Sequence, residues 1–249
     1  MLAMVGCLLT TACIGPRVVT NTQLARPVPV DTTAFVSTVA GPPVQPVFPL
    51  LDAAAFNGKT NKLADRILAA QAEAVEVFRD TLLTALRAQL PATVVTAEAI
   101  HDDASAARLR GGGEVSTKRE HFPVAHLANG DLLLTDLAAE HVPNRLFATS
   151  PALRAKVAAA AEASGAEVVL VAHANLAVVS AGALGVFGTA RMEARLFLFD
   201  RKGIERAEVF AQSELESIPG NRLEDYTRIV GTLSSLADDL AAELAKLLR

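Results

Sequence analysis

The 249-residue chain has no tryptophan, a single tyrosine and only two cysteines, Cys7 and Cys13. With so few aromatic residues, the core is expected to be aliphatic, and the ten phenylalanines are its bulkiest members. The net charge is also small: its formal value is −4, and it is spread along the chain without runs. A nucleic-acid-binding surface would need a basic stripe, which is absent, so we do not expect nucleic acid as a partner.

Residues 1–16 contain no charged side chain at all. Their apolar run of about 13 residues is shorter than the roughly 20 residues that a membrane-spanning helix needs. A secretory signal peptide has an apolar stretch of about this length, with small residues before its cleavage point. Thr11 and Ala12 supply those small residues, directly before Cys13.

At Cys13 this stretch resembles the lipobox of bacterial lipoproteins. The resemblance implies that residues 1–12 are a signal peptide that is removed, that a diacylglyceryl group is attached to the thiol of Cys13, and that the new amino terminus is acylated. Cys7 is the rival site, although it leaves almost no apolar segment before it. In lipoproteins of enteric-type bacteria an Asp after the cysteine favours the inner membrane. Because Ile14 stands there, the resemblance implies a periplasm-facing protein of the outer membrane.

Removal of residues 1–12 would leave Cys13 as the single thiol of the chain. No internal disulfide could then form. One acyl chain gives only marginal membrane binding, whereas two or more chains anchor a protein stably. We therefore expect the membrane to be a partner through a lipid anchor.

Proline density divides the remaining chain into a tether and a domain. Seven of the twelve prolines fall between Pro16 and Pro49, a density that disfavours helix and favours extended chain. Residues 13–43 are therefore expected to form a lipidated, proline-rich tether, and residues 44–249 a single domain. The alternative is that the last ten residues of this segment pack against the domain as an arm.

Within the domain, periodicity and turn signals predict alternating helices and strands. Spacings of three and four residues predict a long helix that ends before Pro91. Ser150-Pro151 and Gly165 delimit a second helix. The remaining expected elements are an edge strand at 44–51, a short strand at 93–95, a loop over 101–120, a hairpin around Asn129-Gly130, a buried strand at 168–172 that residues 175–180 either continue or pair with, a hairpin of 191–199 with 204–212, and one last helix from Asn221.

These elements predict an α/β (α+β) fold, in which a long helix from the N-terminal half and a C-terminal helix cover a mixed sheet with antiparallel hairpins. Their order, with an anchored N-terminus, is similar to that of the periplasmic lipoproteins related to the curli secretion channel and to the activators of penicillin-binding proteins. The resemblance covers residues 44–249. It implies a domain that recognises partners or assembles with them, and no reaction.

Glycines at 182, 185 and 188 punctuate an apolar stretch between two expected strands. Their spacing is not that of a dinucleotide-binding fingerprint, so we expect a connecting loop. Leu184, Val186 and Phe187 are then candidates for contact with a partner or a membrane, because apolar side chains at a loop tip often mark such contacts. Simple burial is the alternative.

The sequence offers no convincing catalytic, cofactor or metal site. Gly58-Lys59-Thr60 matches the end of a phosphate-binding loop, but Ala53 stands where the first glycine is required. None of the serines at 164, 180, 213 and 234 lies in a G-x-S-x-G turn. The histidines have no metal-ligand spacing; they are His101, His121, His126, His141 and His173.

The sequence therefore predicts a non-enzymatic, membrane-anchored envelope lipoprotein whose domain binds or helps assemble another envelope protein. An alternative is a subunit of an oligomeric outer-membrane secretion or transport assembly, so homo-oligomerisation stays open. Two further alternatives are an envelope enzyme, with His121 or His126 beside Ser or Asp side chains, and a carrier of a small ligand or lipid. A carrier would need an internal pocket of several hundred cubic ångströms.

Overall fold

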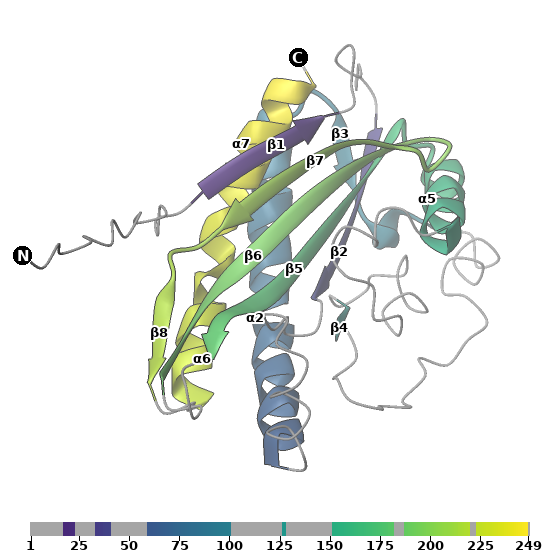
Figure 1. The fold of residues 1–249 in the computed structure, drawn as a ribbon. Helices are drawn as coiled ribbons and strands as arrows, with labels where there is room; N and C mark the ends of the chain where they lie inside the picture. The colour runs from purple at the N-terminus through teal and green to yellow at the C-terminus, as the bar shows by residue number, and fades with distance from the viewer. Residues whose placement is uncertain are drawn as a thin grey trace, which may run out of the picture.

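The fold is of the expected α+β class, with a single mixed sheet and flanking helices (Figure 1). It comes from a computed structural model that describes residues 17–22, 33–40, 59–100, 126–127, 151–181, 187–219 and 223–248.

The sheet has eight strands in the order β1-β7-β6-β5-β2-β3, with β4 paired to β2 and β8 paired to β6. Its two long central strands form an antiparallel hairpin, and strand β2 runs parallel to both β5 and β3. The strands are β1 (Arg17–Thr22), β2 (Thr33–Ala40), β3 (Thr93–Val95), β4 (His126–Leu127), β5 (Val168–Ala181), β6 (Phe187–Asp200), β7 (Glu205–Gln212) and β8 (Glu216–Pro219).

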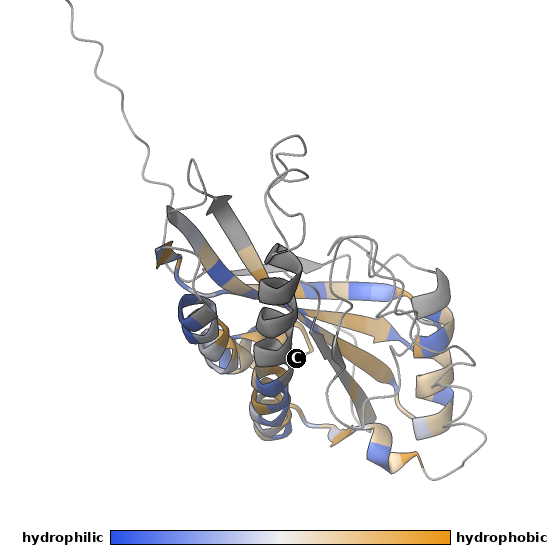
Figure 2. Cartoon of the chain, turned by 90° about the horizontal axis from the view of Figure 1, so that it is seen from below, coloured by the Kyte–Doolittle hydropathy of each residue, from blue (hydrophilic) through white to orange (hydrophobic). Residues whose placement is uncertain are grey.

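Three helices cover one face of this sheet. They are α2 (Lys59–Gln89), α6 (Leu223–Val230) and α7 (Leu236–Leu247). Alternate residues of the strands, such as Leu170 on β5 and Leu196 on β6, are fully buried with Phe78 and Leu82 of α2 in one aliphatic cluster. Figure 2 shows this pattern as largely hydrophobic central strands beside helices that carry polar residues. Within the described residues, no helix is both long and apolar enough to cross a membrane.

The helix α5 (Pro151–Ser164) packs near β5 and β2, on the other face of the sheet. Its buried residues Val157, Ala160 and Ala161 lie outside the main aliphatic cluster, as do Val169 and Phe197 of the strands. Opposite parity along a strand means the opposite face, so α5 covers this second face at one end of the sheet. Gly165 ends the helix with a φ of +69°, as its position in the sequence predicts.

The expected tether is the main correction to the sequence analysis. Residues 17–22 and 33–40, which the sequence places in a proline-rich tether, are strands β1 and β2 of the sheet. The arm alternative anticipates β2 but not β1. Proline cannot donate a hydrogen bond in a sheet, and the prolines of this segment flank the two strands without entering either. The described fold therefore includes residues of this segment from Arg17 onward.

The end of the chain holds a second correction. One continuous last helix was expected, but a 3₁₀ segment, Gly231–Ser235, separates α6 from α7. Gly231 has low helix propensity, and the hydroxyl of Thr232 donates to the carbonyl of Ile229 at 2.7 Å. The Ser235 hydroxyl donates to the Thr232 carbonyl in the same way. Such local bonds compete with the regular helical pattern.

Several expected elements are confirmed, and others lie outside the described residues. The long helix α2, strand β3, helix α5 and the β6–β7 hairpin occur where the sequence predicts them. Strand β8 and the short 3₁₀ turn Ala97–Ala99 were not expected. The edge strand at 44–51 and the loop at 101–120 lie outside the described residues. Of the hairpin around Asn129-Gly130, the structure describes only β4.

Candidate functional site

A band of polar side chains crosses the second face of the sheet, beyond the end that α5 covers. We call it the polar strip. Its polar members are His173 and Asn175 of β5, Arg191, Glu193 and Arg195 of β6, and Glu208 and Gln212 of β7, and Phe210 of β7 lies among them. Strand register brings them together, because His173 is paired with Arg195, which is paired with Phe210. Most of these polar groups are less than one tenth exposed.

Arg195 is the centre of the polar strip. Its guanidinium forms an ion pair with the Glu208 carboxylate, and the two side chains are only 17% and 10% exposed. The same guanidinium lies 4.3 Å from the centre of the Phe210 ring, a cation–π contact. A neighbouring pair joins Arg191 to the Glu193 carboxylate at 2.8 Å. The strip is thus held together by charge pairing.

Burial, and to a smaller extent the positive charge of Arg195, lowers the pKa of His173 to about 4. The imidazole is therefore neutral in the folded protein at neutral pH. A neutral ring beside the Arg195–Glu208 pair adds no second positive charge to the buried band.

The buried histidine makes stability depend on pH. The pKa of His173 is about 4 in the folded chain and 6.5 for a histidine in contact with water, so the unfolded chain binds more protons between these values. Stability from this group is therefore complete above pH 6.5 and falls as the pH drops towards 4, by about 3 kcal/mol in total. Urea unfolding of wild type and His173→Gln across this range should show a steeper loss for wild type. Parallel curves would contradict the prediction.

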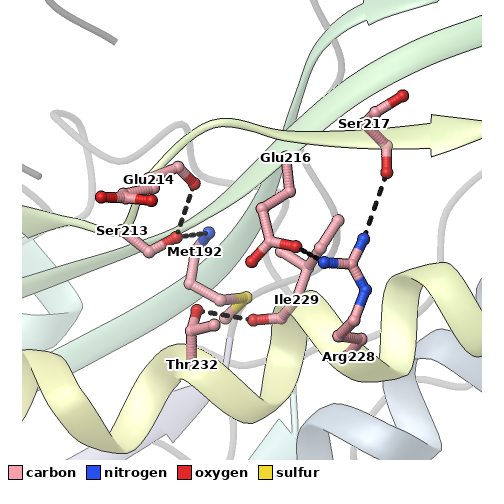
Figure 3. Close-up of polar contacts among 8 residues, drawn as sticks. All are labelled: Met192, Ser213, Glu214, Glu216, Ser217, Arg228, Ile229 and Thr232. Carbon is pink, nitrogen blue, oxygen red and sulfur yellow. Dashed lines mark hydrogen bonds and ion pairs between the residues drawn. The ribbon is translucent and has the colours of Figure 1, made fainter. Parts of the chain in front are cut away.

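A second polar cluster joins strands β7 and β8 where the chain leaves one and enters the other (Figure 3). The backbone N–H of Ser213 donates to the carbonyl of Met192 at 3.0 Å, and the Ser213 hydroxyl accepts from the Met192 N–H at 3.0 Å. That hydroxyl also donates to the Glu214 carbonyl at 3.1 Å. A side-chain oxygen thus occupies the position of a backbone acceptor, which lets β7 end without leaving the Met192 N–H unpaired.

Arg228 ties helix α6 to strand β8 in the same region (Figure 3). Its guanidinium is paired with the Glu216 carboxylate and donates to the Ser217 carbonyl at 3.4 Å. Because β8 pairs with β6, these contacts hold the start of the β6 strand, β8 and α6 as one unit. This unit forms one end of the sheet.

The sequence-predicted site residues lie mostly outside the described part of the chain. Cys13, Leu184 and Val186 fall there, as do His101, His121 and His141. Phe187 is the first residue of β6, where it is paired with Pro219, and its side chain is outside the description. His126 lies on β4 opposite Ala40.

The described residues offer limited chemistry. The Ser164 hydroxyl donates to the Ala160 carbonyl at 2.6 Å and accepts from the Ala166 N–H, so it serves the end of α5. The Ser213 hydroxyl is likewise engaged in hydrogen bonds, with Met192 and Glu214 at the junction of β7 and β8. In the described ranges, no three His, Cys, Asp or Glu side chains are grouped closely enough to hold a metal ion.

One pocket of about 400 Å³ lies between the C-terminal ends of α2 and α7. It is lined by Gln89, Leu90, Pro91, Ala245 and Leu248. The pocket is open to solvent at the ends of two helices. It differs in this respect from the enclosed interior that a carrier of lipid or small ligands needs.

The sequence analysis missed the polar strip, although one signal was available. Residues 191–195 alternate charged with apolar side chains, a pattern typical of a strand with one polar face. In the structure that polar face is largely buried: Glu193 is buried, Arg191 and Arg195 are partly buried, and the buried His173 and Glu208 of the two neighbouring strands lie beside them. To predict that these side chains lie together, the order of β5, β6 and β7 in the sheet would have to be known.

Comparison with known proteins gives a weak structural likeness. No protein-family model and no curated protein matches the chain. Two solved structures of the PelC dodecamer from Paraburkholderia phytofirmans, one of them a point variant, each share 14% sequence identity with it. The TM-scores are 0.32 and 0.33, over 94% of this chain and 96% and 98% of those chains. At that level the likeness carries no argument about function.

Proposed function

We propose that the protein is a membrane-anchored bacterial envelope lipoprotein whose α+β domain binds or helps assemble another envelope protein at the outer membrane. The observation that carries the proposal is the uncharged apolar run that ends in Thr11-Ala12-Cys13. Removal of residues 1–12 would leave every described element intact, since the first strand begins at Arg17. We assign the domain no catalytic role.

A binding role is supported by the sheet edge that follows the proposed anchor. Among the described strands, β1 has one neighbour, β7, so its other edge offers backbone donors and acceptors. Such edges are where an extended segment of a partner protein can add a strand. The partner would meet the domain beside the membrane that carries it.

Intact-mass analysis of membrane-extracted protein tests the anchor. Wild type should lack residues 1–12 and carry acyl mass on the chain that begins at Cys13, and Cys13→Ser should keep residues 1–12 and lose the acyl mass. Cys7→Ser is the matched control, because it removes the rival thiol and should leave processing unchanged. A wild-type chain that keeps residues 1–12, or lacks acyl mass, contradicts the proposal.

In-cell crosslinking followed by mass spectrometry tests the binding role. The expected product joins the anchored wild-type chain to a different envelope protein and is lost in Cys13→Ser. Products at multiples of the chain's own mass would instead support the alternative, a subunit of an oligomeric secretion or transport assembly.

A further inference from the structure

The chain between the proposed anchor and the sheet is very short. Only residues 14–16 separate Cys13 from Arg17, the first residue of β1. Four Cα steps span at most about 14 Å, even when the chain is fully extended. An acylated Cys13 would therefore hold the start of β1 within about 14 Å of the bilayer surface.

The register of the sheet shows which end of the domain this is. Arg17 is paired with Gln212, which is paired with Glu193 on β6. Along β6, Glu193 lies close to Ala190, where the pairing with β8 begins. Asp200, at the other end of β6, is seven residues from Glu193, or about 24 Å. Because Thr22, at the other end of β1, is level with Leu198, the Arg17 end of β1 is the end nearer to β8 (Figure 1).

The two ends of the sheet also differ in charge. At the β8 end, the outermost three strand pairs are Phe187 with Pro219, Gly188 with Ile218 and Thr189 with Ser217, none of which is charged. The next pair inward is Ala190 with Glu216, and the Glu216 carboxylate is paired with Arg228. In sequence, residues 174–190 carry no charged side chain. The opposite turn holds Asp200, Arg201, Lys202, Glu205 and Arg206. Charged groups lose hydration near a bilayer, so the end whose outermost strand pairs are uncharged fits the membrane better.

Resting on the proposed lipid anchor, we propose that the β8 end of the sheet, Gly188–Ala190 with Ser217–Pro219, lies against the phospholipid leaflet that holds the anchor. The opposite turn then points away from the membrane. The first turn of α6, close to this end, carries Glu224 and Asp225, so the leaflet that fits is zwitterionic, rich in phosphatidylethanolamine. In this orientation the β8 end of the sheet is nearest the bilayer, and the strands extend away from the membrane.

Site-specific fluorescence quenching tests this orientation on the acylated full-length protein. Single cysteines replace Ser217 at the β8 end or Lys202 at the opposite turn, both exposed, and each carries the same thiol-reactive fluorophore. The mature chain has no other free thiol once Cys13 is acylated. Each protein is placed in phosphatidylethanolamine–phosphatidylcholine vesicles that contain a nitroxide-headgroup phospholipid, which quenches only at short range.

The two labels are well separated, because Thr189, opposite Ser217, lies eleven residues from Asp200 along β6, or about 37 Å. We expect several-fold stronger quenching at Ser217→Cys than at Lys202→Cys. Equal quenching at both, as in a domain lying on its β1 edge, or stronger quenching at Lys202→Cys, overturns the orientation while the anchor stands. Intact mass of the same samples reports on the anchor separately: absence of acyl mass overturns the proposed function, and this inference with it.

Discussion

Glu208→Gln is expected to lower the free energy of unfolding by about 3 kcal/mol, because removing one member of a buried ion pair leaves an uncompensated charge. The carboxylate of Glu208 is only 10% exposed and pairs with Arg195, which is 17% exposed. Few waters can replace the lost carboxylate around the guanidinium. Urea unfolding at neutral pH measures the loss.

A double variant separates the cost of the orphaned charge from the net contribution of the pair. Arg195→Met with Glu208→Leu should be closer to wild type than Glu208→Gln, because replacing both buried charges by apolar groups is often neutral or stabilising. Glu224→Gln, at an exposed position of α6, is the matched control and should change stability by less than about 0.5 kcal/mol. A loss from Glu208→Gln no larger than that of the control would show that the pair is well solvated.

The part of the fold set by local patterns could be predicted from the sequence. Helix α5 follows from Ser150-Pro151 and Gly165, and the β6–β7 hairpin follows from alternation on both sides of a polar turn. These signals depend only on residues close in the chain, whose side chains fit one backbone conformation.

The N-terminal strands could not be predicted in the same way. Strand β2 is held by parallel pairing with β5, more than 120 residues later in the chain, and β1 by pairing with β7. Neither pairing produces a pattern in the residues close to the strand, and the surrounding prolines favoured an extended tether over strands at the two short apolar runs. The polar strip was missed for the same reason, since Arg195, His173 and Glu208 come from three strands.

The site itself was only partly within reach of sequence reasoning. Cys13 can be named from the residues around it, but its closeness to the folded domain depends on where the first strand begins. If a long tether separated the anchor from the domain, the anchor would not restrict how the domain is oriented relative to the membrane. With β1 starting at Arg17, an acylated Cys13 would restrict which end of the sheet can approach the membrane.

Gly203→Ala is expected to destabilise the protein by about 3 kcal/mol, through two effects at one position. Gly203 has a φ of +70°, a conformation that costs an L-residue roughly 1 kcal/mol or more. A Cβ atom there would also lie 2.2 Å from the carbonyl oxygen of Arg154 in α5, so the turn or the helix must shift. Forced displacement in a packed region adds about 1–3 kcal/mol.

Gly165→Ala isolates the contact from the backbone strain. Gly165 has nearly the same φ, +69°, but nothing lies within 4 Å of an added Cβ atom, so its loss should be limited to about 1 kcal/mol. Chemical unfolding gives both values, and hydrogen exchange should show faster opening of α5 in Gly203→Ala alone. Equal losses in the two variants would mean that the turn bearing Asp200 and Gly203 moves freely past α5. The expected excess instead follows from the rigidity of the turn, whose Asp200 carboxylate accepts hydrogen bonds from the backbone N–H groups of Lys202 and Ile204.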